Sequence, residues 1–499
     1  MSEIRNLDVR TWDAREIVAR SNRIDIHIKF AYARYYKAYG HASVEMSKLY
    51  LESIKTFNSF IEDDPLKKGP SDFLKHFQGL IESIRAMGYI VHDDHEQVRL
   101  GTDGEVISGA HRIATCAAYD TPVVFEVDSK TDYQKFDFEY FHKKGVSKHV
   151  LDLASLTKAS LDNTLKCLVV HSNVPNEKFS EIITYIKKQP ASQYSIVSKQ
   201  LNLSAITALK YINYRSGSDI SNNLDWTFPK NNVHSEILSH ALSSYGKFET
   251  RLILFSEKYE GEINNLKKDL REKLGLNNFN IHSTEEHSEA RNIIEIFCQP
   301  LLLHILSMNK PKNICNAFEK LMLARESLRK SGLKPHIVVV GGSMILELAG
   351  YRSARDIDLF VDNIADLNLH DLTDSADVNI EFHEISSLHN FSKVEELRSD
   401  TLGTFELLGF RFISLKELYE FKVRRSEFPK DKIDSRAISE ILSLTSYHKI
   451  NQSINMEALM LAWKILSKIK QLQKRIIIFL YKFHVVRRSY KFLKQIFLK

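Results

Sequence analysis

A short turn in the last third of the chain carries residue types suited to holding a phosphate. Gly341-Gly342-Ser343 follows KPHIVVV, a run rich in β-branched residues, and leads into the helical pattern SMILELAG. Two glycines after a strand let the backbone approach a phosphate closely, and a helix opening at Ser343 would favour an anion through its first amides. We therefore expect Gly341, Gly342 and Ser343 to bind nucleotide phosphates.

Asp356 and Asp358 follow the turn within fifteen residues or fewer and lie two apart in the strand-like DIDLFV. At that spacing both carboxylates project from one face of a strand. Neighbouring carboxylates repel each other, and a divalent cation is the usual reason to keep them together. We predict Mg²⁺ held by Asp356 and Asp358 and bridging the phosphates of ATP or another nucleoside triphosphate. The alternative is a strand with two surface aspartates beside a tight Gly turn.

A third carboxylate would act on the attacking hydroxyl. In VNIEFHE, alternation directs the apolar residues to a core and places Glu381 on the opposite face, with Asn379 and His383. We predict Glu381 as this third catalytic carboxylate, and Asp377 and Glu384 are the alternatives.

This combination resembles the nucleotidyltransferase fold, the superfamily of polymerase β-like, tRNA-nucleotide-adding and aminoglycoside-modifying enzymes. The resemblance rests on the strand-GGS-helix at 336–350, on GYRSARDIDLFV, and on GFRFISLKELYEFKVRRSEFPKDKIDSRAI. It implies that the residues matching Ser343, Asp356 and Asp358 bind nucleotide phosphate and metal. It also implies that Lys422 and the pair Lys430-Asp431 lie near the nucleotide.

A second small-residue turn, Ser108-Gly109-Ala110, leads into a helix that begins with His111-Arg112. Free helix amides and a guanidinium would converge there on a spot the size of one anion. GEVISGAHRIATCAAYDTPVVFEV resembles the partition-protein (ParB) and sulfiredoxin-like fold, with Ser108 where Asp is more usual. The resemblance implies that Gly109, His111 and Arg112 bind nucleotide phosphates. The alternative is a satisfied core histidine and a structural arginine.

The hydrophobic pattern predicts an α/β multidomain protein in which four regions position these residues. Helical spacing dominates the first eighty residues, strand-like and helical segments alternate from about 165 to 310, and Gly (18) and Pro (10) are scarce. We expect a helical segment with a ParB/sulfiredoxin-like α+β domain at 1–150 and a middle α/β domain of unassigned role at 151–330. A nucleotidyltransferase-fold α/β domain at 331–445 and basic amphipathic helices at 446–499 complete the prediction.

The basic character of the chain belongs to its last segment. Residues 464–499 hold eleven Lys and Arg and no Asp or Glu, so the formal charge of +6 leaves −5 on residues 1–463. The apolar residues between these cations recur at three- and four-residue spacing. Such a helix can bind an anionic membrane surface. The alternatives are helices packed on the body and nucleic-acid binding, which the acidic body disfavours.

Composition restricts the class of protein further. Among 499 residues, 26% are charged and 10% aromatic, which is typical of globular proteins. The four cysteines have no paired spacing, which favours a reducing compartment. The first residues lack the apolar run of a signal peptide, and no stretch of about 18 apolar residues occurs. We expect a cytoplasmic protein, peripheral on the inner face of the membrane through its tail.

These observations favour a Mg²⁺-dependent nucleotidyl and phosphoryl transferase. We expect it to act on a sugar, polyol or glycan intermediate in surface-polysaccharide biosynthesis. The first alternative is a toxin-like nucleotidyltransferase that modifies tRNA or protein, with a ParB-like domain that senses nucleotide. The second is a DNA-binding ParB-like protein, in which SAITALKYI would be a recognition helix.

Overall fold

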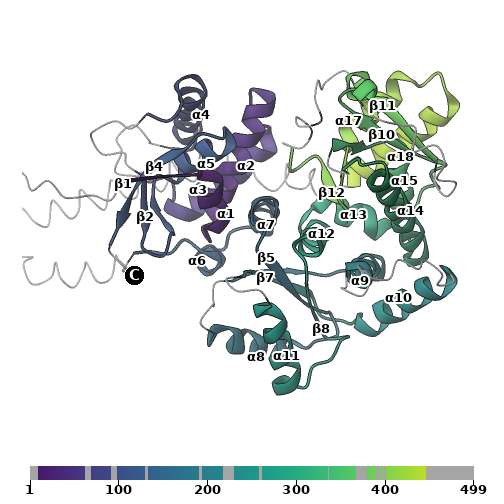
Figure 1. Cartoon of the computed structure of the whole chain (residues 1–499), viewed down its shortest axis with the longest axis horizontal. Helices are drawn as coiled ribbons and strands as arrows, with labels where there is room; N and C mark the ends of the chain where they lie inside the picture. Colours follow the sequence, from purple (N-terminus) through teal and green to yellow (C-terminus); the bar gives the residue numbers. More distant parts are fainter. Residues whose placement is uncertain are drawn as a thin grey trace, which may run out of the picture.

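The computed structural model describes most of the chain as mixed α/β with three sheets (Figure 1). The residues it describes are 9–61, 69–90, 98–129, 133–189, 194–216, 230–257, 261–334, 337–366, 379–388, 394, 397 and 400–444. The α/β multidomain class predicted from the sequence agrees with this architecture. No helix within these ranges is long and apolar enough to cross a membrane. The basic tail lies outside the described residues, so its membrane role stays a prediction.

Within its described residues, the N-terminal unit packs seven helices around a small sheet of strand order β1-β4-β2-β3. β4 pairs antiparallel with β1 and parallel with β2, and β2 pairs antiparallel with β3. The elements are β1 (Val9–Trp12), α1 (Ala14–Arg20), α2 (Ile24–Tyr39), α3 (Val44–Asn58), α4 (Pro70–Met87), β2 (Val98–Gly101), β3 (Val106–Ser108), α5 (Ala110–Ala118), β4 (Val123–Asp128), α6 (Phe138–Lys143) and α7 (Lys148–Leu161).

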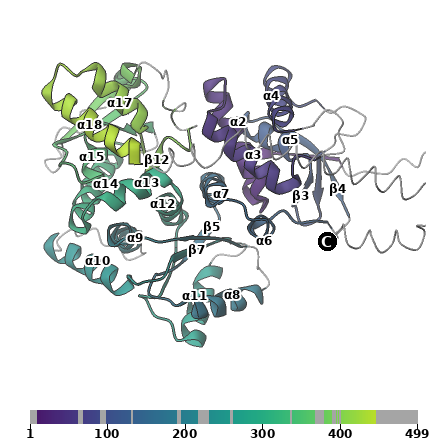
Figure 2. The ribbon, with the colours of Figure 1, turned by 180° about the vertical axis from the view of Figure 1, so that it is seen from behind.

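The middle unit is built on an antiparallel sheet of order β6-β7-β5-β8. Helices α8 and α11 cover one face of this sheet, and α9 and α12 lie on the other, as the front and back views agree (Figures 1 and 2). The elements are β5 (Leu165–Val170), α8 (Asn176–Lys187), β6 (Tyr194–Lys199), α9 (Leu203–Ser216), α10 (Lys230–Ser244), β7 (Thr250–Ser256), α11 (Glu262–Leu274), β8 (Ile281–Ser283), α12 (His287–Cys298), α13 (Pro300–Met308) and α14 (Pro311–Lys330).

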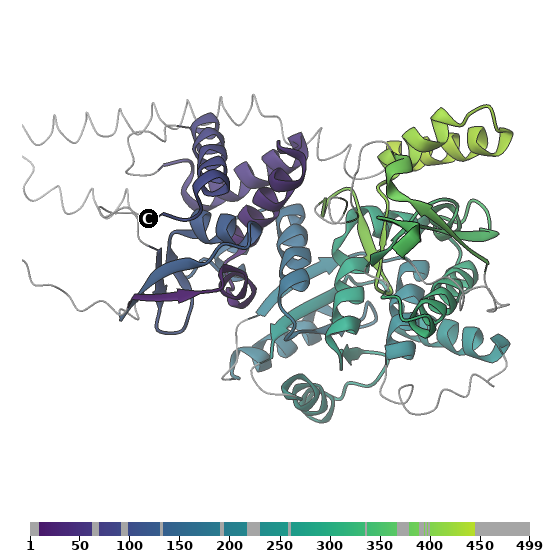
Figure 3. The ribbon, with the colours of Figure 1, turned by 45° about the horizontal axis from the view of Figure 1, so that its top comes forward.

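The C-terminal unit holds a mixed sheet of order β11-β10-β9-β13-β12. β10 pairs antiparallel with β9 and parallel with β11, and β13 pairs parallel with β9. Figure 3 shows its yellow-green C-terminal helices at the end of the molecule away from the purple N-terminal helices. The elements are β9 (Val339–Val340), α15 (Met344–Leu348), β10 (Asp356–Val361), η3 (Ile364–Asp366), β11 (Asn379–Glu384), η4 (Ile385–Leu388), β12 (Phe405–Leu407), β13 (Phe410–Phe412), α17 (Leu415–Arg424) and α18 (Pro429–Leu444).

One hydrophobic core runs through the middle and C-terminal units, so the predicted boundary at residue 330 does not separate two cores. Buried residues from Leu156 to Ile441 belong to it, including side chains of α9, α12, α14 and β10. The N-terminal unit has its own core, to which Leu402 of the C-terminal unit also contributes. Helix α7 contributes to both cores and contacts α2 on one side and α12 on the other.

Helix α9 contains the SAITALKYI segment that the DNA-binding alternative would use as a recognition helix. Its residues Ala205, Ile206, Leu209 and Ile212 are buried in the shared core. A recognition helix must expose a face to the major groove. The burial of α9 argues against that role.

Candidate functional site

Strands β10 and β11 place three carboxylates on one face of the C-terminal sheet. In β10, Ile357 and Leu359 are buried in the core, whereas Asp356 and Asp358 are half-buried on the opposite face. β11 runs parallel to β10 in a register that pairs Asp358 with Glu381. Directly paired residues point to the same face, so Glu381 lies beside Asp358. Among its two alternatives, Asp377 lies outside the described residues and Glu384 is exposed at the strand end.

The glycine turn lies directly against β10. The backbone N–H of Gly341 donates to the carbonyl oxygen of Asp358 at 3.0 Å. Gly342 has φ +59°, and a Cβ there would overlap the Asp358 carboxylate oxygen. Because the backbone is left-handed and the carboxylate occupies the space, Gly342 tolerates no side chain.

Ser343 follows the turn and is 2% exposed, and its hydroxyl has no hydrogen-bond partner in the part of the chain that the structure describes. Helix α15 after it has only five residues, shorter than the SMILELAG pattern predicts, and the Ser343 side chain does not cap it. A buried hydroxyl without a partner is costly unless something bonds to it. Its position beside Gly342 makes a substrate oxygen a suitable partner.

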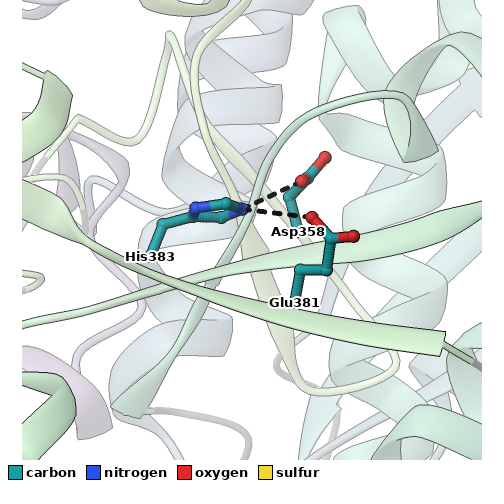
Figure 4. A group of neighbouring side chains, drawn as sticks. All are labelled: Asp358, Glu381 and His383. Atoms are coloured by element: carbon teal, nitrogen blue, oxygen red, sulfur yellow. Dashed lines mark hydrogen bonds and ion pairs between the residues drawn. The ribbon is translucent and has the colours of Figure 1, made fainter.

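His383 joins Asp358 and Glu381 in a compact polar cluster (Figure 4). Its Nε2 lies 3.0 Å from Asp358 Oδ1 and 4.0 Å from Glu381 Oε2. One ligand atom from each residue lies within 4.8 Å of the others. Burial raises the pKa of Asp358, but the hydrogen bond and charge of His383 and the charge of Lys422 outweigh it and lower this pKa. The same hydrogen bond raises the pKa of His383.

Basic side chains face this cluster from the α17–α18 pair and from the loop before β10. The buried Lys422 Nζ lies 2.6 Å from Asp431 Oδ1 and 3.3 Å from Asp434 Oδ2. Arg352 donates two hydrogen bonds to Asp434, at 2.9 and 2.8 Å. An ammonium has three donors, so these two carboxylates leave Lys422 one N–H for another acceptor. Asp434 thus fixes both Arg352 and Lys422.

The turn at Gly109 lies elsewhere, in the N-terminal unit, against an aromatic core. The His111 ring packs edge-on against Phe77 at 4.7 Å between centroids, and its Nε2 lies 2.9 Å from the Tyr50 hydroxyl. Arg112 is half-buried, and burial lowers its pKa. Gly109 caps α5 with φ +82°, where a Cβ would clash with Val98. These contacts favour the structural interpretation of His111, and nucleotide binding at Gly109, His111 and Arg112 stays a prediction.

Three residues in the C-terminal cluster had no role assigned from the sequence. His383 was placed on the face of Glu381 by alternation, but its contact with Asp358 depends on the strand pairing. Arg352 stands four residues before Asp356, and Asp434 three after Asp431, so proximity to the motif was their only signal.

No family model, curated protein or solved structure matches the chain. What the site can do therefore rests on its donor set. The carboxylates of Asp356, Asp358 and Glu381 are hard oxygen ligands of the kind that Mg²⁺ prefers. The Gly342 position, where any Cβ would overlap the Asp358 carboxylate, keeps the backbone close to the Asp358 oxygens. The side chains of Asp358, Glu381 and His383, whose ligand atoms converge, fit a divalent cation, and Asp356 lies on the same face of β10 outside that converging group.

Proposed function

We propose that the C-terminal unit is the catalytic part of a Mg²⁺-dependent nucleotidyltransferase. The observation that carries this proposal is the parallel pairing of Asp358 with Glu381 beneath a turn in which only glycine fits. In chain order, β9 leads into the glycine turn and is followed by β10, which carries the two aspartates. The next strand, β11, pairs parallel with β10 and carries the glutamate. This order supports the resemblance drawn from the sequence.

Asp356 and Asp358 would hold the cation. When bound, Mg²⁺ would neutralise charge on the triphosphate. The amide of Gly342 and the hydroxyl of Ser343, which has no partner among the described residues, would donate to phosphate oxygens. His383, which bonds Asp358 here, holds that carboxylate in place.

The reaction forms a bond between an acceptor oxygen and the α-phosphorus and breaks the bond from that phosphorus to pyrophosphate. Glu381 would accept the proton from the acceptor hydroxyl, since its carboxylate lies on the face of Asp358 and is half exposed. Lys422 and Arg352 would offset the negative charge that develops on the phosphates. Both cations are already fixed by Asp434, so little reorganisation is needed.

The acceptor class favoured by the sequence is a sugar, polyol or glycan intermediate. A specific observation supports a macromolecular acceptor, tRNA or protein, as the second candidate. Large apolar side chains are exposed on α17, α18 and the turn between them: Val423 (41%), Phe428 (51%) and Ile433 (64%). Arg425, whose guanidinium lies over the Phe428 ring, is also on this turn. Exposed apolar groups rimmed by charge are typical of macromolecular contact surfaces.

The test is pyrophosphate release from nucleoside triphosphates by the purified full chain with Mg²⁺. We expect turnover that requires Mg²⁺ and falls at least about 10³-fold in Asp358→Asn. Label from α-³²P nucleotide, followed in a cell extract, should enter small molecules or lipid for the first acceptor class and macromolecules for the second. Turnover unchanged in the variant Asp356→Asn/Asp358→Asn would reject the proposal.

A further inference from the structure

A buried pair of basic side chains lies in the middle unit, away from the C-terminal cluster. Lys210 on α9 is 6% exposed, and its Nζ lies 2.9 Å from Nε2 of the fully buried His171, which follows β5. Burial lowers the pKa of Lys210 to about 8, and burial together with the charge of Lys210 holds the pKa of His171 well below its usual range. The pair is therefore an ammonium donating to a neutral imidazole.

Several donors around this pair have no acceptor within the described chain. With Nε2 accepting from Lys210, the imidazole proton is on Nδ1, which is buried without a partner. Asn213 lies three residues after Lys210, on the same side of α9, and neither atom of its side-chain amide has a partner. The Nε of Arg271 is also buried without one, and the charge of Arg271 helps to lower the pKa of Lys210.

No described carboxylate forms an ion pair with Lys210. Glu289 is a buried carboxylate on the same side of the sheet as α9, where Val169 faces the shared core, but it already has partners. Its two oxygens are bonded to His282 Nε2 at 2.8 Å and to the Glu285 amide at 2.8 Å. Buried cations without a counter-charge and buried donors without acceptors are both unfavourable. An anion bound among them would remove both costs.

We propose that Lys210, His171 and Asn213 form a phosphate-binding site in the middle unit. The ligand is free phosphate or the phosphate group of a small monoester. Phosphate presents several acceptor oxygens and can accept from Lys210, His171 and Asn213 together, whereas a carboxylate presents only two. The site does not depend on nucleotidyl transfer, and it gives the middle unit a role that the sequence leaves unassigned.

The test is thermal unfolding of the full chain with inorganic phosphate and, in a second arm, ribose 5-phosphate, each against chloride at equal ionic strength. We expect saturating ligand to raise the Tm by about 2–4 °C in the wild type. Lys210→Met should lose this shift, and Lys268→Met, which removes an exposed lysine of α11, should keep it. A shift in the phosphate arm identifies the free ion as a ligand, and one in the monoester arm alone identifies an esterified phosphate.

A second measurement uses the wild type alone and holds even if Lys210→Met does not fold. Phosphate beside Lys210 raises the pKa of its ammonium, so binding at pH 8 should take up protons. Calorimetry in two buffers of different ionisation enthalpy measures this uptake. Absence of a Tm shift in both arms, an equal shift in Lys210→Met, or binding without proton uptake would overturn the proposal, leaving buried water as the partner of these donors.

Discussion

The turns at Gly342 and Gly109 begin from similar sequences and have different surroundings. Both follow a strand, place a glycine at positive φ and lead into a helix. At Gly342 the neighbour is the Asp358 carboxylate of β10, which pairs with Glu381 of β11, whereas the helix after Gly109 packs its histidine on Tyr50 and Phe77. The comparison teaches that the elements packed against such a turn, more than the turn itself, decide whether it can take part in chemistry.

We expect the largest loss of nucleotide turnover from a change at Glu381, which the pairing of β11 with β10 brings to the site. Glu381→Gln removes the proposed proton acceptor and should lower nucleotide turnover by about 10²–10⁴-fold, with little change in nucleotide binding. Steady-state rates and nucleotide titrations measure the two quantities. Glu384→Gln, an exposed change on the same strand, is the matched control. Equal losses in both variants would contradict the assignment of Glu381.

Replacing Gly342 or Gly109 with alanine tests directly whether the two turns have different roles. Gly342→Ala pushes a methyl group into the Asp358 carboxylate and should lower turnover by about 10²-fold. Gly109→Ala presses on Val98 and should cost about 1–3 kcal/mol of stability without lowering turnover per folded molecule. Urea unfolding and pyrophosphate release separate the outcomes. If Gly109→Ala lowers turnover as much as Gly342→Ala does, both turns serve the reaction.

His111→Ala asks whether the N-terminal turn binds nucleotide or only stabilises the fold. The change removes an aromatic contact with Phe77 and a hydrogen bond with Tyr50, so we expect the free energy of unfolding to fall by about 1–3 kcal/mol. Nucleotide affinity should stay the same. Urea unfolding and equilibrium binding measure both, with the exposed His41→Ala as control. Weaker nucleotide binding without lost stability would restore the phosphate-binding prediction.

The smallest expected effect is on the pH dependence of the free energy of unfolding, which differs between the C-terminal and N-terminal units. Burial raises the pKa of Glu417 in the C-terminal unit to about 7. The native state binds the Glu417 proton more tightly than the unfolded state does. The stabilisation that protonated Glu417 gives is therefore fully present below about pH 4.5 and is lost as pH rises through 7. Burial alone would raise the pKa of Asp25 in the N-terminal unit, but Arg23 and Lys29 lower it, so its contribution is lost only in acid.

Glu417→Gln should therefore be more stable than the wild type by on the order of 1–2 kcal/mol at pH 8 and no more stable at pH 5. Urea unfolding at the two pH values measures the difference. Glu427→Gln, which changes an exposed residue of the same unit, is the matched control. An equal gain for Glu417→Gln at both pH values would contradict the raised pKa.

Local periodicity predicted the parts of the site that lie within one strand. The two-residue repeat placed Asp356 and Asp358 on one face of β10 and separated Glu381 from the apolar residues of β11, as the structure has them. The two-residue repeat could not predict which strands pair with each other in the sheet. The contact of His383 with Asp358 follows from parallel pairing between segments 25 residues apart, which alternation does not determine.

Contacts over longer separations carried no sequence signal. Arg352 and Asp434 are 82 residues apart, and Tyr50 and His111 are 61 apart. In each pair, tertiary packing brings the partners together, and residue types alone do not specify it. The middle unit shows the same limit, because alternating strands and helices predicted α/β structure without indicating that its sheet is antiparallel.

The core shared by the middle and C-terminal units determines which fragments of the chain can fold on their own. A fragment that starts at residue 331 would carry the carboxylate cluster but leave the core side chains of β10 without the α12 and α14 residues that share that core. Such a fragment should be recovered mainly as aggregate, whereas one that starts near Asp162 keeps that core almost complete. The segment predicted from the sequence to carry the nucleotidyltransferase fold is thus shorter than the smallest part of the chain that contains most of the core behind β10.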